Sequence, residues 1–280
     1  MQYFFLILIF FLGTILGSFV AVIVNRYNTG LPFFKGRSIC FSCNTQLQNK
    51  DLIPIFSFLS LKGRCRYCES KIPKETFFTE LLMGFLAVLA ALKSDFLIFN
   101  LSFFSFFFFL IIFFIFANIL LITMYDLKHF IIPDSFLLSF FVLSLVYILI
   151  FSPIIGWQVS IFLPFLSAVI LALPFLLIFL ASKGRWLGFG DVKYILVLGF
   201  FLGFSQGLSA IVLSFWIGAI LSLIALSLKK LTPHINLPLL KNNLTIKSEI
   251  PFGPFLSLGI IISFYLSADL FQIHELFNLF

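Results

Sequence analysis

The sequence predicts an all-α polytopic membrane protein of about eight transmembrane helices, with a small cytoplasmic four-cysteine zinc module between helices 1 and 2. Three observations support this prediction: an extremely apolar composition, eight long apolar runs and a paired arrangement of all four cysteines. Of the 280 residues, 61% are hydrophobic and only 10% are charged. Because soluble domains usually carry about 25% charged residues, this composition excludes a water-soluble globule.

The apolar runs predict the membrane helices, because a helix needs roughly 20 residues to cross the ~30 Å hydrocarbon core. They are Tyr3–Val24, Phe77–Leu92, Phe96–Thr123, Phe136–Phe151, Val159–Ala181, Val192–Phe204, Leu208–Leu228 and Phe252–Leu270. Most of them meet or approach the required length. On length alone, Val192–Phe204 is also compatible with a re-entrant segment.

The distribution of Lys and Arg sets the orientation, since cytoplasmic loops carry the excess of these residues. With eight spans and both termini outside, every Lys and Arg except Lys93 lies on the inner side. This bias would weaken if Val192–Phe204 did not cross, so we predict that it spans the membrane. The same rule accounts for the net charge of +7 without a nucleic-acid partner. The start of the chain lacks the positive region of a cleaved signal peptide.

Three parts follow from these runs. Residues 1–24 are predicted to form the first transmembrane helix, residues 25–76 the zinc-binding module, and residues 77–280 a membrane core containing helices 2–8. A second polar loop, at about 229–250, is predicted between helices 7 and 8. Both polar segments are expected to lie in the cytoplasm, where a substrate can contact them.

The four cysteines form two CxxC pairs. They are Cys40, Cys43, Cys65 and Cys68. Each pair can turn two sulfur atoms toward one ion, and two such turns complete the tetrahedral shell that zinc prefers. Two disulfides or a redox-active CxxC are the alternatives, and a reducing cytoplasm disfavours the disulfides. Four thiolates leave no position open for water, so the expected zinc is structural.

Two of the acidic residues differ from the rest, which lie mostly in loops or near the termini. Asp126 ends the third apolar run, and Asp191 begins the sixth, within Gly188-Phe189-Gly190-Asp191. Both positions are at the predicted cytoplasmic edge of the membrane. Carboxylates next to lipid are costly and usually functional. Two that approach closely share one proton, which is the arrangement of aspartic proteases.

A simpler interpretation stays open for both aspartates. Each is followed two positions later by a lysine, Lys128 or Lys193, so both fit ordinary interfacial charges near helix ends. Asp134, which follows Pro133, fits the N-cap of the fourth helix and is a reserve candidate for catalysis.

Taken together, an ordered set of motifs resembles the type IV prepilin peptidases, which belong to the GxGD group of membrane aspartyl proteases. The motifs are Gly17-Ser18-Phe19, the two CxxC pairs, Asp51 with Ile53-Pro54, Glu80, Asp126 with Ile132-Pro133-Asp134, Gly188–Lys193, and Ile250-Pro251-Phe252-Gly253-Pro254-Phe255. Each motif alone is weak, but their order and spacing are specific. The resemblance covers nearly the whole chain.

The resemblance implies a peptidase of the bacterial inner membrane that removes the basic leader of prepilins or pseudopilins after a glycine, at the cytoplasmic face. It assigns catalysis to Asp126 and Asp191. It also implies N-methylation of the new terminus with S-adenosylmethionine, an activity associated in the family with the cysteine module. The implied partners are prepilin substrates and membrane lipid.

Three other functions remain as alternatives. One is the same peptidase without methylation, because the chain differs from the family pattern at Ala21, Phe41 and Glu75-Thr76-Phe77. Another is an ion-coupled transporter that uses the two aspartates, although transporters favour sites near the bilayer midplane. The third is a zinc-binding scaffold without chemistry of its own.

Overall fold

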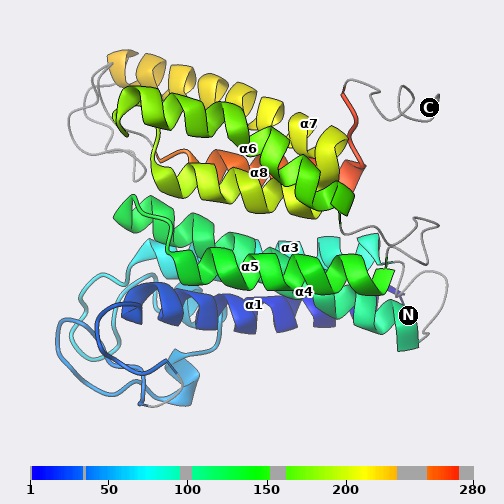
Figure 1. Cartoon of the computed structure of the whole chain (residues 1–280). Coiled ribbons are helices and arrows are strands. Elements are labelled where there is room, and N and C mark those ends of the chain that lie inside the picture. Colours follow the sequence, from blue (N-terminus) through cyan, green and yellow to red (C-terminus); the bar gives the residue numbers. More distant parts are fainter. Residues whose placement is uncertain (1, 34–35, 95–102, 152–161, 232–250, 271–280) are drawn as a thin grey trace. The chain divides into compact units, whose positions relative to one another are not determined.

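The computed structural model describes residues 2–33, 36–94, 103–151, 162–231 and 251–270. Within these ranges, all regular elements are helices (Figure 1). They are α1 (Gln2–Arg26), η1 (Asn49–Asp51), α2 (Phe56–Ser60), α3 (Lys74–Lys93), α4 (Phe103–His129), α5 (Asp134–Phe151), α6 (Phe162–Ser182), α7 (Phe189–Leu231) and α8 (Gly253–Leu266). The prediction of an all-α fold is confirmed.

Five of the described helices, α1, α3, α4, α6 and α7, are long and apolar enough to cross a membrane, and the apolar α5 and α8 are shorter. Large apolar side chains point outward from them. On α6, for example, Leu163, Leu173 and Leu177 are all exposed. Such an apolar surface suits lipid rather than water. A helix can also cross the bilayer because it satisfies its own backbone hydrogen bonds. The chain is a multi-pass membrane protein.

Helix α7 contains two of the predicted apolar runs and bends sharply at Gly203. This glycine has φ 73° and ψ −173°, a conformation that side chains other than glycine rarely adopt. A Cβ atom built on Gly207 would lie 3.6 Å from the Cα atom of Gly199. Eight residues of straight helix would separate these positions by about 12 Å, so the chain reverses at Gly203. The short run Val192–Phe204 is therefore one arm of a helical hairpin.

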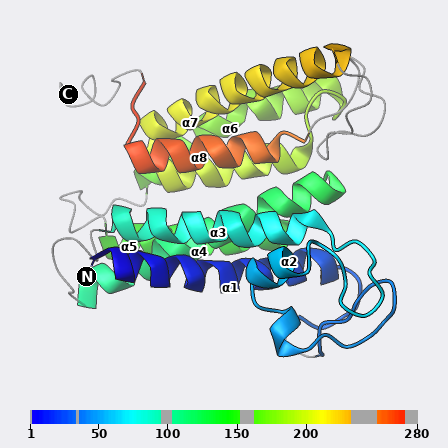
Figure 2. The ribbon, with the colours of Figure 1, turned by 180° about the vertical axis from the view of Figure 1, so that it is seen from behind.

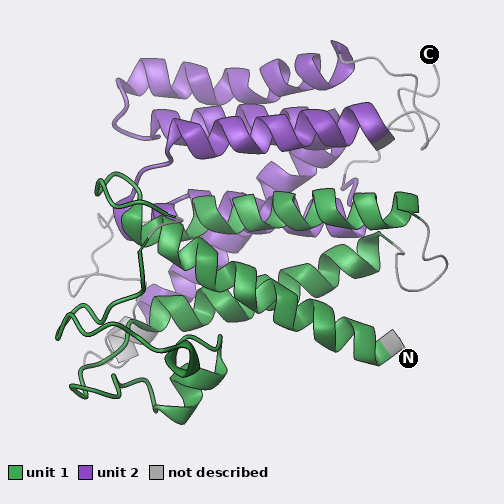
Figure 3. Cartoon of the chain, turned by 90° about the horizontal axis from the view of Figure 1, so that it is seen from below, with its two compact units in different colours: residues 1–124 green, residues 125–280 purple. Residues whose placement is uncertain are grey.

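The chain divides into two compact units, residues 1–124 and 125–280 (Figure 3). In the first unit, α1 packs along α3 (Figure 2). The two helices approach very closely at Gly17, where a Cβ atom would lie 2.7 Å from the Cα atom of Glu80. Small residues at such a crossing let membrane helices pack backbone to backbone.

In the second unit, α7 packs against α5, α6 and α8. The side chain of Phe140 on α5 is fully buried and makes edge-to-face contacts with Tyr194 and Phe201 on α7. Phe264 on α8 also packs on Phe201, with ring centroids 5.0 Å apart. This aromatic core fixes the first arm of α7, which carries Asp191.

The segment between α1 and α3 buries few apolar side chains. Asp51 connects residues from different parts of this segment. The Asp51 carboxylate accepts hydrogen bonds from Arg66 Nε at 2.7 Å, from the Tyr67 hydroxyl at 3.0 Å and from the backbone N–H of Gln48 at 3.1 Å. Burial opposes its ionisation, but the Arg66, Gln48 and Tyr67 bonds outweigh this effect and lower the pKa of Asp51. The second predicted polar loop lies almost entirely outside the described residues.

Candidate active site

Asp126 lies in the last turn of α4, and its side chain is almost completely buried, with 5% of the residue exposed. The backbone N–H of Gly253 donates a hydrogen bond to Asp126 Oδ2 at 3.1 Å. Gly253 is the first residue of α8, and the first N–H groups of a helix have no partner within the helix. One of these groups thus binds the carboxylate. A Cβ atom on Gly253 would lie 2.5 Å from Asp126 Oδ2, so a larger residue would displace the carboxylate or the helix.

Asp191 lies in the first turn of α7, which begins at Phe189. Its half-buried carboxylate accepts a hydrogen bond from the backbone N–H of Gly188, just before the helix. An acidic residue three positions into a helix commonly reaches back in this way. Asp191 is also close enough to Asp126 for the two carboxylates to repel each other. The structure therefore brings together the two aspartates that the sequence singled out.

Two further residues connect α7, which carries Asp191, to α8, which binds Asp126, and neither was a candidate from the sequence. The buried hydroxyl of Tyr194 on α7 lies 2.9 Å from Ser257 Oγ on α8. Ser257 Oγ in turn donates to the carbonyl of Gly253 at 3.0 Å. Their spacing in the sequence could have indicated this position, because Tyr194 follows Asp191 by three residues and Ser257 follows Gly253 by four. Residues at these spacings share a helix face.

Asp134 behaves differently from the two buried aspartates. It begins α5, its side chain is 75% exposed, and its carboxylate pairs with Lys193 Nζ at 2.7 Å. Lys193 also lies over the ring of Phe189, 4.7 Å from its centroid. The lysine that follows Asp191 in the sequence is thus paired with Asp134, which is located at the helix start as predicted.

A buried pair of carboxyl groups supports one well-defined type of chemistry. When two such groups share one proton, the ionised group can accept a proton from water and the other can donate a hydrogen bond to a carbonyl oxygen. The Gly253 N–H can orient Asp126 for either role. This arrangement can hydrolyse an amide bond without a covalent intermediate.

The four cysteines occupy two copies of the same backbone turn. In the first, Cys40 N–H donates to the carbonyl of Thr45, and Asn44 N–H donates to that of Cys40. The second turn repeats this pattern: Cys65 N–H donates to the carbonyl of Ser70, and Glu69 N–H donates to that of Cys65. The residue after the second cysteine of each pair, Asn44 or Glu69, has a positive φ of 54° or 57°. Each turn thereby presents its two thiols on one side.

The sulfur atoms form a compact set. All four Sγ atoms lie within 4.8 Å of one another, and none is in a disulfide. Cys40 Sγ and Cys68 Sγ are 3.8 Å apart. A tetrahedral zinc site with Zn–S bonds of about 2.3 Å has S···S edges of about 3.8 Å, so the cluster fits this ion. The backbone N–H groups of Cys43 and Ser42 lower the pKa of the Cys40 thiol to about 6, which favours the thiolate that zinc binds.

These features define the class as a multi-pass membrane protein with a buried aspartate pair and a four-cysteine cluster that suits a metal. Residues 11–94 match the bacterial peptidase A24 N-terminal domain, and residues 113–223 match the type IV leader peptidase family. The chain belongs to the type IV leader peptidase family. It is therefore an enzyme of the peptidase class.

Several curated relatives are similar over most of the chain. The prepilin leader peptidase/N-methyltransferase of Bacillus subtilis (strain 168) is 28% identical over 193 residues, which are 69% of this chain and 72% of the relative. The protein of the same name from Vibrio cholerae serotype O1 is 27% identical over 71% of this chain and 78% of its own. The one from Stutzerimonas stutzeri is 24% identical over 89% of this chain and 86% of its own. No solved structure matches the chain.

Proposed function

We propose that this protein is an intramembrane aspartyl endopeptidase that removes the leader peptide of type IV prepilins or pseudopilins, with Asp126 and Asp191 as its catalytic residues. One observation carries the assignment of these residues. Asp126 is buried beside Asp191 and is held by the Gly253 N–H, an arrangement that an ordinary interfacial charge does not need. The relatives' names support prepilins as the substrate class.

The proposed reaction is a direct attack of water on the scissile peptide bond. The ionised aspartate takes a proton from water, and the water oxygen forms a bond to the carbonyl carbon. The protonated aspartate donates a hydrogen bond to the carbonyl oxygen and stabilises the charge that develops there. The C–N bond then breaks, and a proton passes to the leaving amine. Gly253 contributes by fixing the orientation of Asp126.

The cleavage site is proposed to lie at the cytoplasmic face of the bacterial inner membrane, after a glycine of the leader. The excess of Lys and Arg in the loops next to Asp126 and Asp191 supports this orientation. The short basic leader of a prepilin would remain on the same side.

A second activity is proposed for the same chain, namely N-methylation of the new N-terminus. The relatives named above carry N-methyltransferase in their names, and S-adenosylmethionine is the expected methyl donor. The donor would supply the methyl group when bound. We propose that Cys40, Cys43, Cys65 and Cys68 hold one structural zinc ion, which stabilises a module with little apolar core of its own.

A cleavage assay with the purified protein tests this proposal. Detergent-solubilised protein is incubated with a prepilin, and the product is analysed by mass spectrometry with and without S-adenosylmethionine. We expect loss of the leader in both reactions, and methylation of the mature terminus only with the donor. Inhibitors of serine, cysteine and metalloproteases should leave cleavage unchanged. An intact prepilin after incubation would contradict the peptidase assignment.

A further inference from the structure

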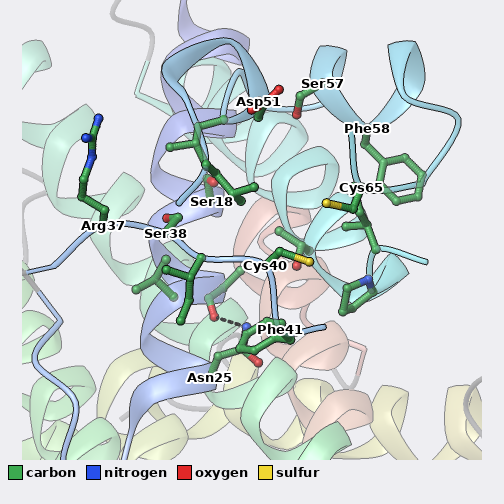
Figure 4. A pocket seen from close by; sticks show the side chains of 18 of the residues that line it. Ser18, Asn25, Arg37, Ser38, Cys40, Phe41, Asp51, Ser57, Phe58 and Cys65 are labelled. Carbon is green, nitrogen blue, oxygen red and sulfur yellow. Dashed lines mark hydrogen bonds between the residues drawn. The ribbon is translucent and has the colours of Figure 1, made fainter. Parts of the chain in front are cut away.

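A large pocket lies in the first unit, between the ends of α1 and α3 and the cysteine-containing segment (Figure 4). Its volume is about 530 Å³, which is within the range of about 300–1,000 Å³ that is usual for small-molecule sites. Its lining includes Ser18 and Ala21 from α1, Phe77 and Glu80 from α3, and Phe58 from α2. The pocket consists entirely of residues of the first unit, whereas both aspartates of the pair belong to the second.

Glu80 is the unusual group in this lining, because it is a carboxylic acid with only 6% of its surface exposed. It accepts hydrogen bonds from the backbone N–H of Ile55, at 2.7 Å, and from the side chain of Ser18. In the part of the chain that the structure describes, Glu80 forms no salt bridge with a lysine or an arginine. A buried carboxylate is costly unless a positive charge compensates it.

The backbone beside Glu80 is strained. Ile55 has φ 64° and ψ −53°, and the N–H of Phe56 bonds to the carbonyl of Pro54 at 2.6 Å. These features define the rare form of γ-turn, which is costly for a β-branched residue. Strain of this kind persists where the surroundings impose it, and it is concentrated at ligand sites. Here it directs the Ile55 N–H at the Glu80 carboxylate, so the acid is held in one position.

The lining also contains the basic residues Arg26, Arg37, Arg66 and Lys71, and another part of it is suited to a ligand with a flat apolar part. The rings of Phe58 and Phe77 are stacked with centroids 4.9 Å apart and form one aromatic wall. Asp51 also lines the pocket, but Arg66, Tyr67 and Gln48 already bind its carboxylate. Glu80 is therefore the acid that remains to compensate a cationic ligand. A carboxylate has about four acceptor positions, and Ile55 and Ser18 use two of them.

We infer that this pocket binds S-adenosylmethionine, with Glu80 compensating the positive charge of the donor and Phe58 and Phe77 contacting its adenine. The inference rests on the methylation proposed above, and it assigns to that activity a location and residues. S-adenosylmethionine combines a flat base with a cationic sulfonium and an ammonium group. This combination matches an aromatic wall and one uncompensated buried carboxylate.

Equilibrium binding of radiolabelled S-adenosylmethionine to the full-length protein in detergent tests this inference. Glu80→Gln keeps the shape of the side chain but removes its charge, and we expect it to weaken binding by at least about tenfold. Ala21→Leu, which adds volume at the buried wall of the pocket, should weaken binding to a similar degree. Glu75→Gln is the matched control, because this exposed acid lies on the same helix outside the pocket. It should bind as the wild type does.

Two measurements keep the result interpretable. The thermal unfolding midpoint and the zinc content show which variants are folded, and only these enter the comparison. Light-induced crosslinking of the bound donor to wild-type protein, mapped by mass spectrometry, is expected to label residues within 36–80. This readout depends neither on a substitution nor on enzymatic turnover.

The outcomes separate this inference from the proposed function. Wild-type methylation, with unchanged donor binding in folded Glu80→Gln and Ala21→Leu proteins, would overturn the pocket assignment and leave methylation intact. Crosslinks confined to residues 125–280 would have the same meaning. Labelling of the pocket by a photoreactive leader peptide and not by the donor would also overturn it. Failure of the wild type both to bind donor and to methylate would overturn both proposals.

Discussion

The backbone N–H of Gly253 donates a hydrogen bond to Asp126 Oδ2 at 3.1 Å, across 127 positions of the sequence. This bond joins the end of α4 to the start of α8. It also gives the Pro-Phe-Gly-Pro stretch a structural role, because the proline after Gly253 favours a helix start and the glycine leaves room for the carboxylate.

Gly253→Ala is expected to impair cleavage severely. The new Cβ atom would lie 2.5 Å from Asp126 Oδ2, so the carboxylate or the helix must shift. A displacement of about 1 Å at a catalytic group commonly costs about 100-fold in rate, and we expect kcat/KM for prepilin cleavage to fall by about that factor.

Gly218→Ala is the matched control for this substitution. Its Cβ atom would lie 3.2 Å from the ring of Phe255, a side chain that can move. Its cleavage rate should stay within about twofold of the wild type. Wild-type activity in Gly253→Ala would show that the close contact with Asp126 has no role in catalysis.

The Tyr194–Ser257 hydrogen bond is expected to support the same geometry from α7. Tyr194→Phe and Ser257→Ala each remove one partner of a buried bond, which usually costs about 1 kcal/mol. Each should also lower kcat for prepilin cleavage, because Ser257 bonds to Gly253. The double variant should be less impaired than the sum of the single variants, since they remove the same interaction. Strictly additive effects would mean that the two hydroxyls act independently.

Asp134→Asn should leave the cleavage rate within about twofold of the wild type. The Asp134 side chain is 75% exposed, and a salt bridge at such a site usually contributes only about 0–1 kcal/mol. Loss of cleavage in this variant would make Asp134 a catalytic candidate and would contradict the assignment of Asp126 and Asp191 as the pair.

Cys65→Ser should remove the metal. Four sulfur atoms within 4.8 Å of one another form one cluster, and the buried Cys65 thiol is part of it. We expect the zinc content of the purified protein to fall from about one ion per chain to near zero, with faster proteolysis between residues 36 and 73, because structural zinc contributes folding energy. Ser60→Ala, on α2 in the same segment, should retain zinc and resist proteolysis. Equal zinc content in both variants would exclude the four-cysteine metal site.

Most of the architecture was predictable from the sequence because the relevant signals are local. Each apolar run produced a helix, and even the short Val192–Phe204 run is a separate arm, because Gly203 reverses the chain. The cysteine spacing likewise predicted the cluster, since each CxxC forms its turn from neighbouring residues. Helix ends were less predictable. Helix α4 continues past the apolar run to His129, so Asp126 lies inside the helix rather than after it.

The parts of the site that depend on distant residues were not predictable. Nothing near Asp126 in the sequence indicates that its partner is the amide of Gly253. Similarly, Glu80 was one of the motif residues, but the sequence did not predict its burial, which depends on α1 and on the γ-turn at Ile55. Local patterns predicted the two aspartates and the four cysteines as candidate site residues. The residues that orient them became visible only in the folded chain.

Prepilin cleavage by folded Asp126→Asn and Asp191→Asn proteins is the decisive test of catalysis by the aspartate pair. Asparagine keeps the size of the side chain but can neither take a proton from water nor share one with its neighbour. The two-aspartate mechanism predicts that each substitution alone lowers kcat by about 1,000-fold or more, with no further loss in the double variant, because the two groups act as a unit. Cleavage at a rate near that of the wild type by either single variant would contradict it.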